Sequence, residues 1–167
     1  MNAFQRSWEI TKLSFDVMKK DKELFLFPII GGIFSILFMI AMIFPLIVSA
    51  ALPSSLAGIY LWLAIFVIYF GLAFISVFFN VATVYTVKTR FNGGNATFLD
   101  SIKFAFSKIH LIIGWSIISA IVGLILRILE EAAERMGGIG EIIIKIIVGM
   151  LGLAWSLITS FVIPVMV

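Results

Sequence analysis

The chain has 167 residues, of which 62% are hydrophobic and only 13% are charged, giving a mean hydropathy of +1.20. A soluble domain carries about 25% charged residues, so this composition excludes the ordinary soluble class. The net charge of +3 does not indicate nucleic-acid binding, because the basic residues lie beside apolar segments, where anionic lipid headgroups attract them. Since there is no cysteine, disulfides, thiolate metal sites and Cys nucleophiles are also excluded.

The chain begins with a charged leader, residues 1–23, whose periodicity predicts an amphipathic helix on the cytoplasmic side. Small polar side chains, Ser7 and Thr11 among them, run along the centre of its apolar face. They favour docking on another helix, and simple anchoring at the membrane surface is the alternative. The basic residues of the opposite face are candidate lipid-headgroup contacts: Lys12, Lys19 and Lys20.

Four apolar blocks follow, and each is long enough to cross a bilayer, whose hydrocarbon core needs about 20 residues of helix. They are residues 24–52, 58–87, 109–129 and 142–167. We therefore predict an all-α membrane protein, in which four transmembrane helices form a single membrane domain over residues 1–167.

The second block contains Asn80, the most polar side chain that lies well inside a span. An amide without a partner in hydrocarbon costs several kcal/mol, so Asn80 must pair with another helix or face a polar cavity. Thr83 and Thr86 follow at helical spacing. The three residues are therefore a candidate polar path toward the cytoplasm, with an interhelical hydrogen bond at Asn80 as the structural alternative.

A second leader, residues 97–108, precedes the third block. Thr97 and Asp100 have the spacing of a capping box, with Asp in place of the usual Glu. Phe98 and Ile102 begin an apolar side, so we expect a second amphipathic helix at the membrane interface.

The third and fourth blocks contain pairs of small residues four positions apart, at Ser119 and Gly123 and at Gly152 and Ser156. Such pairs let helices approach closely in membranes. We therefore expect these two blocks to pack on each other.

A charged segment connects these two blocks, and its charges pair at helical spacing. It is expected to continue the third helix until Gly137-Gly138 ends it. Two interpretations stay open, a self-neutralised helix end and an acidic vestibule that attracts cations. The candidate external cluster consists of Arg127, Glu130, Glu131 and Glu134.

The distribution of Lys and Arg predicts the orientation in the membrane. Nine of them lie in the first leader and in the stretch from Lys88 to Lys108, against three in the opposite connectors. By the positive-inside rule, the N-terminus is cytoplasmic. We expect a multi-pass protein of the plasma membrane whose C-terminus is also cytoplasmic.

Catalytic and metal-binding patterns are missing from the sequence. There is no HExxH, GxSxG or P-loop motif, and His110 stands alone at a membrane boundary without a second imidazole or a thiol. We expect no enzymatic activity, no catalytic or metal-ligating residues and no cofactor.

Short motifs spread over the chain carry a resemblance to known proteins. They are Ser7-Trp8-Glu9, Lys20-Asp21-Lys22-Glu23-Leu24, Phe27-Pro28, Phe78-Phe79-Asn80, Arg127-x-x-Glu130-Glu131, Leu153-Ala154-Trp155-Ser156 and Pro164-Val165. In them the chain resembles an uncharacterised family of prokaryotic multi-pass membrane proteins, a domain of unknown function. It is more loosely similar to the membrane domain of bacterial glycerophosphodiester phosphodiesterases. The resemblance implies architecture but no activity, and it implies that this chain is truncated after Val167.

The sequence thus predicts, first, a non-enzymatic membrane scaffold that interacts with lipid or with a partner protein. The alternative is a channel or transporter module that conducts a small solute or ion. The expected partners are the lipid bilayer and either a second copy or another membrane protein, and not nucleic acid.

Overall fold

The computed structural model describes residues 5, 7–9 and 22–167, and all regular structure in these residues is helical. The four long helices are each long and apolar enough to cross a membrane. They are α2 (Lys22–Ala51), α3 (Ser54–Phe91), α5 (Ile109–Met136) and α6 (Gly138–Met166), with the short helix α4 (Phe98–Ser107) between α3 and α5. The prediction of an all-α membrane protein with four spans is confirmed.

Most of the predicted first leader lies outside the described residues. Its candidate headgroup contacts Lys12, Lys19 and Lys20 belong to that part of the chain. Residues 5 and 7–9 are helical.

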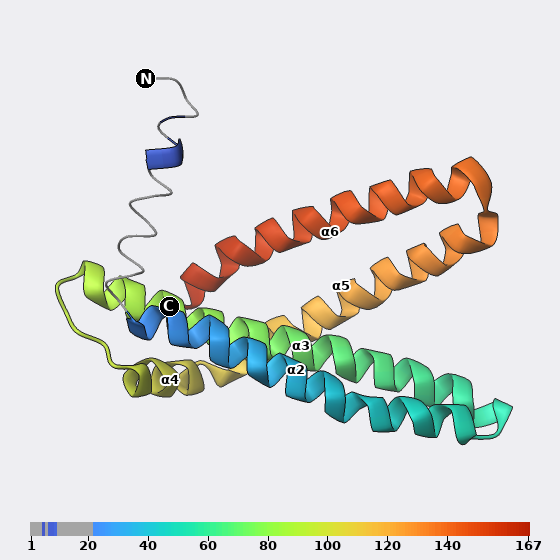
Figure 1. The fold of residues 1–167 in the computed structure, drawn as a ribbon, viewed down its shortest axis with the longest axis horizontal. Coiled ribbons are helices and arrows are strands. Elements are labelled where there is room, and N and C mark those ends of the chain that lie inside the picture. Colours follow the sequence, from blue (N-terminus) through green and yellow to red (C-terminus); the bar gives the residue numbers. More distant parts are fainter. Residues whose placement is uncertain (1–4, 6, 10–21) are drawn as a thin grey trace.

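The long helices form two antiparallel hairpins, α2–α3 and α5–α6, which meet along α3 and α5 (Figure 1). The hairpins lie close together near α4 and the C-terminus and diverge toward their turns (Figure 1). Because α6 approaches α3 only toward its C-terminal end, polar residues of three helices come together there.

Helix α3 is longer than a membrane crossing requires. Its 38 residues extend roughly 57 Å, whereas the hydrocarbon core is about 30 Å thick. The end that carries Lys88 and Arg90 therefore projects beyond the apolar layer. Helix α5 likewise continues to Met136 and ends at Gly137, whose φ is 64°, as the sequence predicts.

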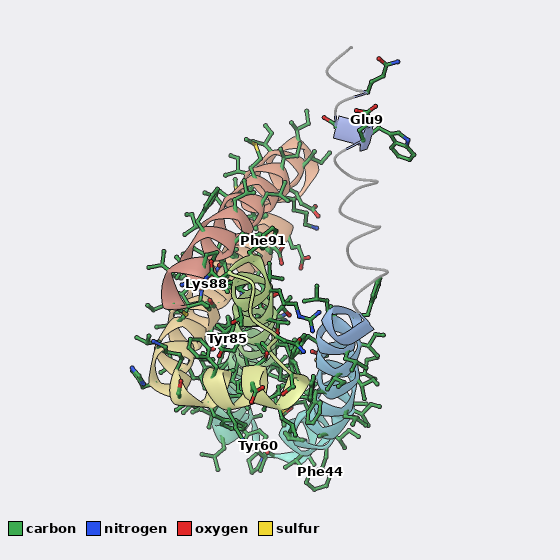
Figure 2. The ribbon with its side chains drawn as sticks, turned by 90° about the vertical axis from the view of Figure 1, so that its left-hand side faces the viewer. Glu9, Phe44, Tyr60, Tyr85, Lys88 and Phe91 are labelled. Carbon is green, nitrogen blue, oxygen red and sulfur yellow. The ribbon has the colours of Figure 1, made fainter. Side chains whose placement is uncertain are left out.

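Helix α4 begins with the predicted capping box. The Asp100 N–H donates to the Thr97 hydroxyl, and the Thr97 N–H and hydroxyl both donate to the Asp100 carboxylate. These donors lower the pKa of Asp100. Figure 2 shows α4 crossing from the α2 side of the molecule to the α5 side, the transverse direction expected of an interfacial helix.

Aromatic contacts fix α4 against the bundle. Phe98 stacks on Phe27 of α2 with ring centroids 5.0 Å apart, and Phe106 meets Phe78 of α3 edge-on, also at 5.0 Å. Phe27 is fully buried. Since α4 contacts both helices of the first hairpin, it closes one end of the space between them.

Small residues let the helices approach each other. Gly31 of α2 lies under the Phe79 ring of α3, and an added Cβ would be 3.1 Å from that ring. Gly123 of α5 lies under Tyr69 of α3, where a Cβ would be 2.9 Å from the ring. Helices α5 and α6 pack on each other as expected. Gly123, which was expected at that contact, instead lies where α5 meets α3 of the other hairpin.

A buried hydrogen bond joins α3 to α4. The hydroxyls of Thr86 and Ser101 are 2.6 Å apart, and both residues are fully buried. Thr86→Val removes this bond and is expected to lower the free energy of unfolding by about 1 kcal/mol. Unfolding of the purified protein in detergent measures this change, and an unchanged stability would contradict a structural role for the pair.

Candidate functional site

Asn80 lies inside the apolar part of α3, toward the end that carries Lys88. It precedes Lys88 by eight residues, which corresponds to about 12 Å of helix. The residue is exposed on the surface of the isolated molecule. At this depth an exposed amide requires a polar neighbour, water or a ligand.

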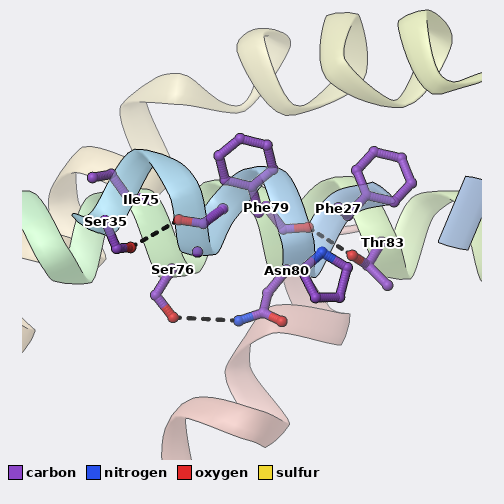
Figure 3. Close-up of a pocket in the computed structure, with 10 residues that line it drawn as sticks. Phe27, Ser35, Ile75, Ser76, Phe79, Asn80 and Thr83 are labelled. Atoms are coloured by element: carbon purple, nitrogen blue, oxygen red, sulfur yellow. Dashed lines mark hydrogen bonds between the residues drawn. The ribbon is translucent and has the colours of Figure 1, made fainter. Parts of the chain in front are cut away.

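The first cavity beside Asn80 lies between α2 and α3 and has a volume of about 260 Å³. Figure 3 shows Asn80 and Ser76 side by side on α3, with Thr83 one turn further and Ser35 contributed by α2. Ser35 and Thr83 each donate to a carbonyl of their own helix, at 2.9 and 2.8 Å. Pro28 and the glycines of α2 complete the wall.

A second cavity, of about 240 Å³, lies on the other side of Asn80, among α3, α5 and α6. Asn80 and Ser76 line both cavities. The polar groups that α5 and α6 add to the second one are the hydroxyls of Ser119, Ser156, Thr159 and Ser160. One amide thus stands between two polar spaces at the same depth.

Two groups in the second cavity have unused hydrogen-bonding capacity. The Thr159 Oγ1 atom is buried and has no hydrogen-bond partner among the described residues. Pro164 lacks an N–H, so it cannot donate to the Ser160 carbonyl four residues earlier. Buried polar groups are normally paired, so the cavity suits a ligand or water that supplies the missing partners.

The Asn80 side chain is itself incompletely paired. Its Nδ2 donates to the Ser76 hydroxyl at 3.4 Å, a long bond within the same helix. The interhelical hydrogen bond considered from the sequence is therefore not formed among the residues that the structure describes. An amide has two donor hydrogens and an acceptor oxygen, so most of the capacity of Asn80 faces the cavities.

The predicted polar path needs one correction. Thr83 lines the first cavity with Asn80, but Thr86 is fully buried against Ser101 of α4 and its hydroxyl also bonds to the Ala82 carbonyl. Six residues of helix turn Thr86 about 120° away from Asn80. Asn80 and Thr83 therefore line the same cavity, and Thr86 lies outside it.

The external cluster is paired at the opposite end of the molecule. Arg127 lies 3.3 Å from Glu131, an ion pair without a well-aligned hydrogen bond. Lys145 of α6 contacts Glu141 at 2.7 Å and Glu134 of α5 at 3.5 Å. Glu130 is exposed. Two of these pairs lie within one helix, and the contact of Lys145 with Glu134 crosses the α5–α6 turn. Together they favour the self-neutralised helix end over an acidic vestibule.

The described residues form no candidate metal-binding site. Among them, no group of three or more His, Asp or Glu side chains lies close enough to hold a metal ion. His110 is exposed at the start of α5, at the boundary position where the sequence places it.

A protein-family model matches most of this chain. Residues 59–167 match a family of unknown function, DUF6159. The chain belongs to this family. The match includes every residue of the second cavity, whereas α2 precedes it. No curated protein and no solved structure matches the chain, and the looser similarity to glycerophosphodiester phosphodiesterases is not shown.

Sequence reasoning on this DUF6159 member found Asn80 and Thr83 but missed the other polar residues that line the two cavities. Ser76 is detectable in principle, because it precedes Asn80 by one helical turn. Thr159 and Ser160 carry no signal of their own, since hydroxyl side chains in a membrane helix often bond to their own backbone. Only the approach of α6 to α3 brings them to the amide.

Proposed function

We propose that this protein is a non-enzymatic membrane module that binds a small uncharged polar solute in the two cavities beside Asn80 and carries it across the bilayer. One observation supports this most strongly. Asn80, an incompletely paired amide inside an apolar span, lines two cavities to which serine and threonine hydroxyls also contribute.

The lining of the cavities supports a neutral solute. Among the described residues, no Asp, Glu, Lys, Arg or His lines either of them. An isolated ion there would lose its hydration without gaining an opposite charge, whereas hydroxyl and amide groups replace the hydrogen bonds that water makes with a polyol or an amide. The scaffold interpretation depends instead on leader residues outside the described part of the chain.

We further propose the plasma membrane as the location, with the N-terminus in the cytoplasm. The charge distribution supports this orientation. Because the chain has no cysteine, single replacements report sidedness directly. Asn92→Cys is expected to react with an impermeant thiol reagent only after the cells are opened, and Met136→Cys in intact cells; the reverse pattern would contradict the orientation.

The test of the function is flux through proteoliposomes that contain the purified protein. Vesicles are challenged with gradients of glycerol, urea, K⁺, Na⁺ and Cl⁻, and their volume or ion content is followed with time. We expect glycerol or urea to equilibrate faster than in protein-free vesicles, with ions unaffected. Ion flux without solute flux would overturn the neutral-solute proposal, and no flux at all would overturn transport.

A further inference from the structure

A third cavity, of about 410 Å³, lies where α4 covers the α2–α3 hairpin. Its lining is entirely apolar, in contrast to the two polar cavities. Ile75 and Phe79 line both this groove and the first polar cavity. Each of three helices contributes to the groove: Ile30 and Phe34 from α2, Phe74 and Phe78 from α3, and Ile102 and Phe106 from α4.

The groove is continuous with the lipid-facing surface of α2. Phe34, which lines it, is 54% exposed, and its neighbours Ile29 and Ile33 are 54% and 51% exposed. An apolar cavity of about 150 Å³ already stays dry and binds benzene. A larger groove without polar groups, inside an apolar layer, therefore suits a hydrocarbon chain and not water.

The polar segment beside the groove supplies positive charge. Residues 88–108 carry four basic side chains and one acidic one, a net charge of +3. Lys103 directly follows the groove residue Ile102 in α4 and is exposed. Basic residues at this level of a membrane protein attract anionic headgroups. The apolar groove suits the acyl chain of an anionic phospholipid, and the basic residues beside it suit the headgroup.

We propose that the groove beneath α4 binds one acyl chain of an anionic phospholipid, whose headgroup lies against Lys103. The groove shares only Ile75 and Phe79 with the lining of the first polar cavity and no residue with that of the second, so the proposal is independent of the solute site. Bound lipid would hold α4 against the hairpin at the membrane interface.

Native mass spectrometry of the purified full chain in mild detergent tests this, with phosphatidylglycerol and phosphatidylcholine as the probes. The wild type is expected to retain one phosphatidylglycerol more tightly than phosphatidylcholine. Ile102→Trp fills the groove and is expected to weaken that binding by at least roughly tenfold. Ile117→Trp, a matched change at an exposed position of α5, should leave it unaltered.

Lys103→Gln tests the headgroup contact separately, even where the tryptophan variant does not fold. Because the Lys103 side chain is exposed, this change is expected to leave the fold intact. It is expected to weaken phosphatidylglycerol binding about fivefold and to leave phosphatidylcholine unchanged. Equal binding of the two lipids, or binding unaffected by Ile102→Trp in folded protein, would overturn the proposal. So would a dimer that Ile102→Trp dissociates, since a second copy would then occupy the groove.

Discussion

Replacing Asn80 with leucine is expected to reduce solute flux in proteoliposomes to the level of protein-free vesicles. Leucine has a similar volume but removes the one amide that, among the described residues, lines both cavities. A neutral solute that enters the apolar layer then loses hydrogen bonds, each of which costs about 1–3 kcal/mol when left unmade. Flux is compared at equal protein content with the gradient that the wild type dissipates fastest.

Stability distinguishes this effect from damage to the fold. The Asn80 amide makes one long bond within its own helix, so Asn80→Leu is expected to leave unfolding in detergent unchanged or to raise its free energy. Thr86→Val is the matched control on the same helix, because it weakens a buried contact outside the cavities. Flux retained in Asn80→Leu, or lost in Thr86→Val, would contradict the assignment of the site.

Replacing Gly123 with leucine is expected to lower the free energy of unfolding. The new side chain would meet the Tyr69 ring, which lies 2.9 Å from the position of a Cβ. Overpacking of this kind costs about 1–3 kcal/mol. Since Gly123 lies where α5 contacts α3, the change also forces the two hairpins apart. Unfolding monitored in detergent measures the loss.

Gly114 provides a matched control in the same helix. A Cβ at that position has no neighbour within 4 Å, so Gly114→Leu adds the same side chain on an open surface. It is expected to unfold like the wild type or somewhat later, since glycine is a poor helix former. Equal destabilisation by both substitutions would show that Gly123 has no special role in joining the hairpins.

The long helices were predictable because their cause is local. Each apolar block needs helical backbone to satisfy its hydrogen bonds in a membrane, and Thr97 with Asp100 marks the start of α4 without tertiary information. Gly137, at a φ of 64°, similarly ends α5 where the charged segment ends.

The composition of the site was less predictable because it depends on which faces meet. Asn80 was identifiable from its position inside an apolar span. Thr86 was assigned to the same polar path from its spacing, but that spacing places it on the face of α3 that contacts α4. The contribution of Thr159 arises only because α6 returns to α3. No periodicity in α6 distinguishes that face from one exposed to lipid.

The proposed function requires the second cavity to be polar and wet within the membrane. Thiol accessibility at Ser156 tests this requirement directly. Cysteine reacts as the thiolate, which forms in water but is suppressed in apolar surroundings. Ser156 lines the cavity. Its neighbour Leu157 lies outside the cavity and is 63% exposed, on a surface expected to face lipid. In proteoliposomes, a hydrophilic methanethiosulfonate reagent should modify Ser156→Cys at least about tenfold faster than Leu157→Cys, and equal slow rates would contradict a polar intramembrane site.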